Sequence, residues 1–337
     1  MNCQKNTRRI SFSALGTMAV GCLIILFAAN SAHAIFPGTT WDTSTPEAQC
    51  VDSALLEQAV EYLESLPAEN KSKELVIVRN GYVIWEGTNV DYWHGVYSVT
   101  KSFMSLLFGL LVEDGEIALD NLAKDVDANL SAQFPDVTMR HFLTMTSGYR
   151  AVGDDDPGGY CHGSSDTPYT PGQPLFSPGV QYAYWDSAAN ELGWLVTKLA
   201  DRSMEALFQD RIGSKIGLSA NAWEWGEVVE MDGLTVNGGA GNLGSSVKIS
   251  AIELARIGHL VLNRGNWDGT QVVDSSWIDA ATQVQVPATI PDYGVCGEDL
   301  DGTGVYGYLW WVNGWANGQR LWPDADPSTF AAYGAKN

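Results

Sequence analysis

The sequence predicts an α/β protein of two lobes, in which an antiparallel sheet flanked by helices carries an inserted helical lobe. Two β-rich runs surround Asn80-Gly81 near the start, and strand-like runs such as 308–312 return near the end. The middle of the chain has helical periodicity. We therefore expect 35–114 and 235–337 to form the sheet lobe, with 115–234 as the helical lobe.

The first 34 residues have the pattern of a signal peptide. Three basic residues precede an apolar run from Ala14 to Ala29, which ends in the cleavage-type segment Ala32-His33-Ala34. A membrane anchor is one alternative, but the run is somewhat short for a span of about 20 residues. Lipid attachment at Cys22 is a weaker alternative. We expect a periplasmic or secreted protein without stable membrane insertion after cleavage.

Composition and charge narrow the classes of partner. Hydrophobic residues make up 45% and charged residues 18% of the 337 residues, as in a globular protein. The formal net charge is −21, and cleavage after residue 34 would remove three of the 19 basic residues and none of the 40 acidic ones. Such an acidic protein is not expected to bind nucleic acid. The sequence leaves the oligomeric state open.

The N-terminal elements follow from local patterns. Residues 51–66 carry apolar side chains at helical spacing and predict an amphipathic helix. The runs 75–78 and 82–85 then flank Asn80-Gly81, a dipeptide typical of a two-residue β-hairpin turn. The sheet lobe is thus expected to open with a helix and two strands.

The central elements are expected to be helices. The run from Ser98 to Val112 is apolar on nearly every side and stops before Gly115, which predicts a buried helix. Further helical segments are predicted by similar patterns at 140–146, 187–199, 208–216 and 249–262. Residues 153–178, rich in Asp, Gly, Pro and Ser, predict a long loop.

Ser98 and Lys101 form a Ser-x-x-Lys pair at the start of the buried helix. At this spacing a hydroxyl and an amine lie on one helix face, within side-chain reach. A serine hydroxyl needs a base to become a nucleophile, and a lysine serves only after losing its own proton. The apolar helix predicts that Lys101 is buried, which disfavours the ammonium form and lowers the lysine pKa. The pattern therefore predicts Ser98 as nucleophile and Lys101 as base.

The alternative is that Ser98 caps the helix and Lys101 extends into solvent. A single Ser-x-x-Lys match arises by chance about once in a chain of this length. Ser245 and Lys248 form a second match, after a Gly-rich loop and before a helix with a polar face. Because nothing there would bury Lys248, we assign it to a solvated surface.

Other patterns indicate neither a cofactor nor a metal site. Residues 239–244 (GAGNLG) fit a dinucleotide-binding pattern, but no acidic residue follows about 20 positions later, so a structural Gly loop is favoured. The histidines show no metal-ligand spacing, and His141 is expected to pack or to form hydrogen bonds. We expect no cofactor and no metal.

Three cysteines remain after the proposed cleavage: Cys50, Cys161 and Cys296. An odd number permits one disulfide and leaves one thiol over. Cys161 and Cys296 are the favoured pair, because both lie in Gly- and Asp-rich loops that a disulfide would stabilise.

Five ordered segments resemble β-lactamase-related serine hydrolases, a family that includes class C β-lactamases, penicillin-binding carboxypeptidases, esterases and 6-aminohexanoate-dimer hydrolases. The segments are 98–103 (SVTKSF), 140–148 (RHFLTMTSG), 178–184 (PGVQYAY), 238–244 (GGAGNLG) and 330–334 (FAAYG). The resemblance covers roughly Leu75 to the end. It implies the two-lobe fold of serine β-lactamases and penicillin-binding proteins, with the site between the lobes.

The resemblance also implies roles for individual residues. Tyr184 matches the tyrosine of the family's Tyr-x-Asn motif, and would relay protons beside Lys101. Asp186 stands at the position of the asparagine, among the residues that face the substrate. The third motif, Lys-Thr-Gly in many members, aligns with Ala332-Tyr333-Gly334, which places Tyr333 and Gly334 at the substrate. The backbone N–H groups of Ser98 and Ala335 would form the oxyanion hole.

The sequence favours an exported serine hydrolase of carboxylic esters or small amides that acts through an acyl-serine intermediate. A D,D-carboxypeptidase or β-lactamase is the alternative enzyme, and a non-catalytic binding protein for cell-wall fragments is the alternative outside enzymes. Family members continue with further strands and a long helix after the third motif, so the chain is expected to be C-terminally truncated and of low stability.

Overall fold

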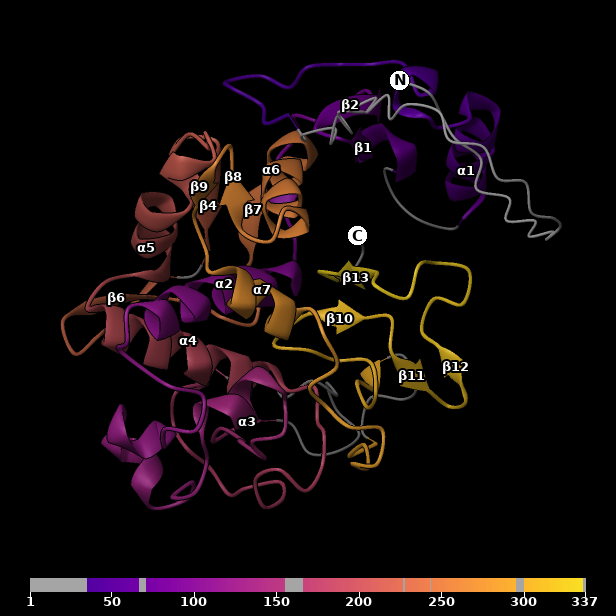
Figure 1. Ribbon diagram of the computed structural model, residues 1–337. Coiled ribbons are helices and arrows are strands. Elements are labelled where there is room, and N and C mark those ends of the chain that lie inside the picture. The colour runs from indigo at the N-terminus through magenta and orange to yellow at the C-terminus, as the bar shows by residue number, and fades with distance from the viewer. Residues whose placement is uncertain are drawn as a thin grey trace, which may run out of the picture.

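The computed structural model describes residues 35–66, 71–154, 166–226, 228–242, 244–294 and 300–335. Figure 1 shows α2 and α7 across the middle of the molecule, with α3 and α4 on one side and α6 with β7 on the other. The helices are α1 (Ser53–Ser65), α2 (Val99–Glu113), α3 (Met139–Leu143), α4 (Asp186–Ala200), α5 (Met204–Arg211), α6 (Ala251–Leu262) and α7 (Ser275–Ala281).

The strands are short, and every pairing between them is antiparallel. β1 pairs with β2, β5 with β6, β8 with β9, β10 with β13 and β11 with β12, while β3, β7 and β4 form a three-stranded sheet. The bounds are β1 Val76–Arg79, β2 Tyr82–Glu86, β3 His94–Gly95, β4 Trp223–Trp225, β5 Val228–Met231, β6 Leu234–Asn237, β7 Val247–Ile249, β8 Asn266–Trp267, β9 Thr270–Gln271, β10 Trp311–Val312, β11 Trp315–Ala316, β12 Gln319–Arg320 and β13 Phe330–Ala331.

The helix α2 lies in the main core, as its apolar sequence predicts. Its residues from Val99 to Leu111 are all buried, and α4, α5 and α7 pack against it. Gly109 lets α7 approach closely, because a Cβ there would lie 2.3 Å from the ring of Trp277. The indole of Trp277 in turn donates to the Ser105 carbonyl at 3.0 Å. A helix apolar on all sides is therefore enclosed on all sides.

The predicted hairpin is confirmed. Asn80 and Gly81 have φ of 54° and 86°, the left-handed conformations that a tight turn between twisted strands requires. Between the described strands, however, no pairing joins this hairpin to β10 and β13, which Figure 1 shows as a separate piece. Both the N-terminal and the C-terminal strands are present, but they do not form one continuous sheet.

The other helix predictions are confirmed with changes at the ends. The segment predicted at 208–216 begins earlier, as α5 at Met204, because the Ser203 side chain caps it by accepting from the Ala206 N–H at 3.2 Å. The strand expected at 308–312 is reduced to Trp311–Val312. Leu309 has a φ of 63°, and its N–H donates to the Leu143 carbonyl at 3.1 Å, so the chain turns there.

Some predictions stay untested. β4 belongs to the segment 115–234 yet pairs with β7, and the proposed lobe boundaries stay a prediction. Cys50 is disulfide-bonded, so it is not the leftover thiol that the preferred pair Cys161–Cys296 implies. That pair and the signal segment lie outside the described residues. Within those residues, no helix combines the length and apolar character needed to cross a membrane.

Candidate active site

Ser98 occupies the N-cap position of α2, and its side chain makes no capping hydrogen bond. The capping alternative is therefore wrong. Tyr97, immediately before it, has a φ of 49°, a strained conformation for an aromatic residue, and its N–H donates to Ser246 Oγ at 2.8 Å. The backbone thus turns sharply into the helix, and the half-buried Ser98 lies at its first turn. The next three N–H groups already donate to the carbonyls of Val96, Tyr97 and Ser98.

Lys101 lies one turn further along α2, and its Nζ contacts oxygens of Ser98, Asp186 and Ala240 and also hydrogen-bonds to Tyr184. The distances are 3.0 Å to Ser98 Oγ, 2.8 Å to Asp186 Oδ1 and 2.5 Å to the Ala240 carbonyl. Lys101 is 1% exposed, so the alternative in which its amine reaches solvent is wrong. Helix α2 therefore brings a hydroxyl and a buried amine into direct contact.

The protonation of Lys101 differs from the expectation. Burial lowers its pKa, as predicted, but the Asp186 carboxylate and Tyr184 act in the opposite direction, and the net pKa lies above the ordinary value. The prediction that burial makes this amine neutral is therefore wrong. The Asp186 carboxylate, 2.8 Å away, and Tyr184 together stabilise the ammonium form more than desolvation destabilises it.

Tyr184 packs beside Lys101 just before α4. The centre of its ring lies 4.8 Å from Lys101 Nζ, and the ring stacks on Trp311 of β10 at 6.2 Å. Burial raises the pKa of its phenol, although the charge of Lys101 and hydrogen bonding to Ser98 oppose this shift. The resting residue is a neutral phenol beside both groups of the Ser-x-x-Lys pair.

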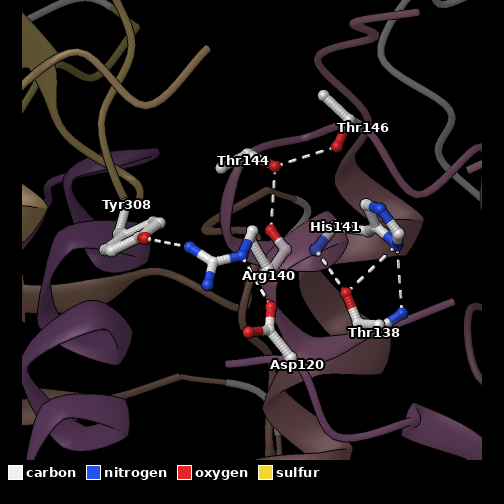
Figure 2. A network of polar contacts seen from close by, with 7 residues as sticks. All are labelled: Asp120, Thr138, Arg140, His141, Thr144, Thr146 and Tyr308. Carbon is white, nitrogen blue, oxygen red and sulfur yellow. Dashed lines mark hydrogen bonds and ion pairs between the residues drawn. The ribbon is translucent and has the colours of Figure 1, made fainter. Parts of the chain in front are cut away.

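The segment 138–148 holds the loop that carries Tyr184. The carbonyl of Met145, a residue with a φ of 54°, accepts from the Ala183 N–H at 2.9 Å. Figure 2 shows the polar contacts that shape this segment, in which the Arg140 guanidinium joins Tyr308 Oη at 2.6 Å and Asp120 at 2.9 Å. The second of the five family segments thus acts as a scaffold.

His141 belongs to the same network (Figure 2). Its side chain and that of Thr138 form a capping box at the start of α3. Burial and the neighbouring Arg140 lower the pKa of its imidazole. The expectation that His141 packs and forms hydrogen bonds is confirmed.

The Gly-rich segment 238–242 supplies a group that sequence reasoning missed, the Ala240 carbonyl bound to Lys101. Asn190 Oδ1 on α4 accepts from the Ala240 N–H at 2.9 Å and fixes this peptide. A Cβ at Gly239 would lie 2.2 Å from the Ala189 carbonyl, and one at Gly241 2.0 Å from the Tyr97 carbonyl. The glycines therefore permit close approach of main chains. In the sequence, these glycines were the feature that could have indicated a main-chain group at the site.

The second Ser-x-x-Lys match has a structural role. Lys248 is exposed on β7 and pairs with Glu224 across the sheet at 2.6 Å, while Ser245 Oγ donates to the Asn242 carbonyl at 2.6 Å. The assignment of Lys248 to a solvated surface is confirmed.

The segment that aligns with the family's third motif, 330–334, lies one strand away from Tyr184. Ala331 is opposite Trp311 in the β10–β13 pair, and Trp311 stacks on Tyr184. After β13 the chain continues through Tyr333, which is 58% exposed, and the buried Gly334 to the exposed Ala335. In the described part of the chain, no hydrogen bond or ion pair joins Tyr333, Gly334 or Ala335 to Ser98 or Lys101, so their roles stay predictions.

Comparison with known proteins identifies the family and the class of fold. The family model described as Beta-lactamase matches residues 72–325, so the chain belongs to the beta-lactamase family of serine hydrolases. The predicted resemblance and fold class are thereby confirmed. No sequence among curated proteins matches this chain.

Two solved structures support the same fold. A Bacillus anthracis protein named as a 6-aminohexanoate-dimer hydrolase has a TM-score of 0.56 and 20% identity, and the match covers 77% of this chain and 68% of that one. A Bacteroides dorei protein named as a beta-lactamase has a TM-score of 0.53 and 16% identity, with coverage of 81% and 79%. At these identities the likeness concerns the fold alone.

Proposed function

We propose that this protein is an exported hydrolase of carboxylic esters or small amides that acts through an acyl-Ser98 intermediate. The observation that carries the proposal is the contact of Ser98 Oγ with a lysine amine that is 1% exposed, at 3.0 Å. A buried amine in this position can exchange a proton with the hydroxyl without competition from bulk water. Membership of the beta-lactamase family supports hydrolase chemistry at this serine.

In the proposed reaction, Lys101 as free amine takes the Ser98 proton while Oγ bonds to the substrate carbonyl carbon. The carbonyl electron pair moves to oxygen, where the backbone N–H groups of Ser98 and Ala335 would stabilise the oxyanion. The intermediate collapses and expels an alcohol or amine, which receives a proton through Tyr184. Water then hydrolyses the acyl ester, releasing a carboxylic acid and regenerating Ser98.

The ester or small-amide preference rests on the segment that aligns with the family's third motif. Ala332 and Tyr333 stand where many family members have lysine and threonine, and the lysine helps those members bind a substrate carboxylate. We therefore expect turnover of a nitrophenyl ester and none of nitrocefin. The opposite selectivity would favour the D,D-carboxypeptidase or β-lactamase alternative.

Labelling with a fluorophosphonate probe tests the nucleophile. We expect the wild type to be labelled, Ser98→Ala to lose all labelling, and Lys101→Ala to lose most of it. The second Ser-x-x-Lys match provides matched controls, since Ser245→Ala and Lys248→Ala should label as the wild type does. Equal labelling of all five proteins would reject Ser98, and an unlabelled wild type would favour the binding-protein alternative.

Export is a separate part of the proposal and rests on the pattern of residues 1–34. The expected product in a Gram-negative host is a periplasmic or secreted protein that begins at Ile35. Mass spectrometry of the mature N-terminus checks this, and a lipid-modified Cys22 would instead show membrane attachment.

A further inference from the structure

We propose that Asp186 is a positioning residue that holds Lys101 as an ammonium ion in the resting protein and thereby restrains Ser98 at neutral pH. This inference rests on the proposed function and concerns the control of the same site. It assigns Asp186, the last residue of Tyr184-Trp185-Asp186, a role in setting the protonation state of Lys101.

Counting hydrogen-bond donors leads to this assignment. The Asp186 carboxylate and the Ala240 carbonyl can only accept, so each takes one N–H from Lys101 Nζ. One position on the nitrogen remains, and it is directed at two hydroxyls: that of Ser98, whose Oγ lies 3.0 Å away, and that of Tyr184, which also hydrogen-bonds to Lys101. An ammonium ion presents its third N–H there, whereas a free amine presents its lone pair. The protonation state of Lys101 therefore decides whether it donates to Ser98 or can take the serine proton.

The charges around Lys101 favour the ammonium ion. Asp186 carries the only charge among the side chains whose contacts with Nζ are described, since Ser98 from α2 and Tyr184 from the preceding loop are neutral. Tyr306, packed on Tyr184, is also a neutral phenol, because burial raises its pKa. Asp186 is the first residue of α4, and the positive end of the helix dipole stabilises its carboxylate.

A second carboxylate holds Asp186 in place. Asp154 accepts from the indole N–H of Trp185 at 2.8 Å and from Ser187 Oγ at 2.6 Å. Trp185 and Ser187 are the two neighbours of Asp186 in the sequence. Both are buried, as are Asp154 and Asp186. The Lys101–Asp186 ion pair therefore lies at the N-terminus of α4, where the surrounding contacts fix the position of the Asp186 side chain.

The test compares the pH dependence of fluorophosphonate labelling in wild type and Asp186→Asn. The asparagine keeps the size and an acceptor oxygen but removes the charge. The labelling rate should rise with pH as Lys101 loses its proton, and we call this part of the pH profile the acidic limb. An adjacent opposite charge moves a pKa by about 1–3 units, so without it the pKa of Lys101 and the acidic limb should move to lower pH by about that amount. Labelling at a neutral pH on that limb should rise roughly tenfold or more.

Asp127→Asn provides the matched control. Asp127 is also buried and also faces a lysine, with 3.6 Å to Lys198 Nζ, but it accepts from Trp194 and does not contact Lys101. Its acidic limb should coincide with that of the wild type. A limb that stays in place in Asp186→Asn, or that moves to higher pH, would overturn the proposal.

Nuclear magnetic resonance of the wild type gives an independent reading, even if Asp186→Asn does not fold. In protein labelled with ¹³C at lysine Cε, the resonance lost in Lys101→Arg belongs to Lys101. We expect the ammonium shift at neutral pH, and a free-amine shift would refute the inference. An ammonium shift in a protein that no probe labels would leave the inference standing and reject the proposed function.

Discussion

At the scale of single residues, Tyr184 combines a packing role of its ring with the proposed proton-relay role of its hydroxyl. Its ring packs against both Lys101 and Trp311, so its apolar surface supports the core, while its hydroxyl hydrogen-bonds with Ser98 and Lys101. Removal of the whole side chain would disturb both. Removal of the oxygen alone tests the proton relay.

Tyr184→Phe should therefore lower kcat by about 10²–10⁴-fold, the usual range for a general acid–base group, with little change in KM. Steady-state ester hydrolysis measures both constants. Tyr182→Phe is the matched control, because Tyr182 lies on the same loop and its buried hydroxyl has no hydrogen-bond partner within the described residues. A similar fall in kcat in both variants would show that the loop, and not the relay, is sensitive.

At the scale of elements, the Gly-rich segment 238–242 connects Tyr97, the strained residue before Ser98, to Lys101. Gly241 packs against the Tyr97 carbonyl, and Ala240, the residue before it, binds Lys101. The same short segment therefore supports the turn into α2 and the third contact of Nζ. A change of main-chain position here would reach both Ser98 and Lys101.

Gly241→Ala should abolish most labelling of Ser98 and lower the melting temperature. The new Cβ would lie 2.0 Å from the Tyr97 carbonyl, so the backbone at the start of α2 must shift. Gly233 has the same φ of 81° but nothing within 4 Å of a Cβ, so Gly233→Ala carries only the backbone penalty, about 1 kcal/mol. Equal loss of stability and labelling in the two variants would contradict the steric explanation.

The sequence correctly predicted the elements whose formation depends on residues close together in the chain. The hairpin at Asn80-Gly81 and the apolar helix α2 depend on neighbouring residues, and both were predicted. The pairing of Lys101 with Asp186 spans 85 residues, and its contact with Ala240 spans 139. Helical spacing could place Lys101 beside Ser98 and predict its burial, but it could not reveal the buried carboxylate that reverses the effect on its pKa.

At the scale of the whole molecule, net charge opposes compactness. The 40 acidic residues far outnumber the 19 basic ones, so most carboxylates have no cation to pair with. Mutual repulsion of the excess negative charge destabilises the folded state relative to an expanded chain. The surface ion pairs of the described residues, such as Lys248–Glu224, act in the other direction.

The melting temperature should therefore rise as sodium chloride is increased from low concentration to about 0.1 M, where the screening length is about 10 Å. Differential scanning calorimetry measures this change, with an equal osmolality of sucrose as the uncharged control. A melting temperature that falls with salt would mean that screened ion pairs outweigh the repulsion.

The contact between Lys101 and the Ala240 carbonyl also affects which positions would tolerate substitution in a scan of every residue of this protein. Every ordinary amino acid at position 240 retains the carbonyl, so many changes there would leave the third contact of Nζ intact. The neighbouring glycines, where any Cβ would meet main-chain atoms, should be the intolerant positions instead. A scan would thus mark Gly239 and Gly241 as essential although neither touches Lys101 with a side chain, and it would overlook the group that does the binding.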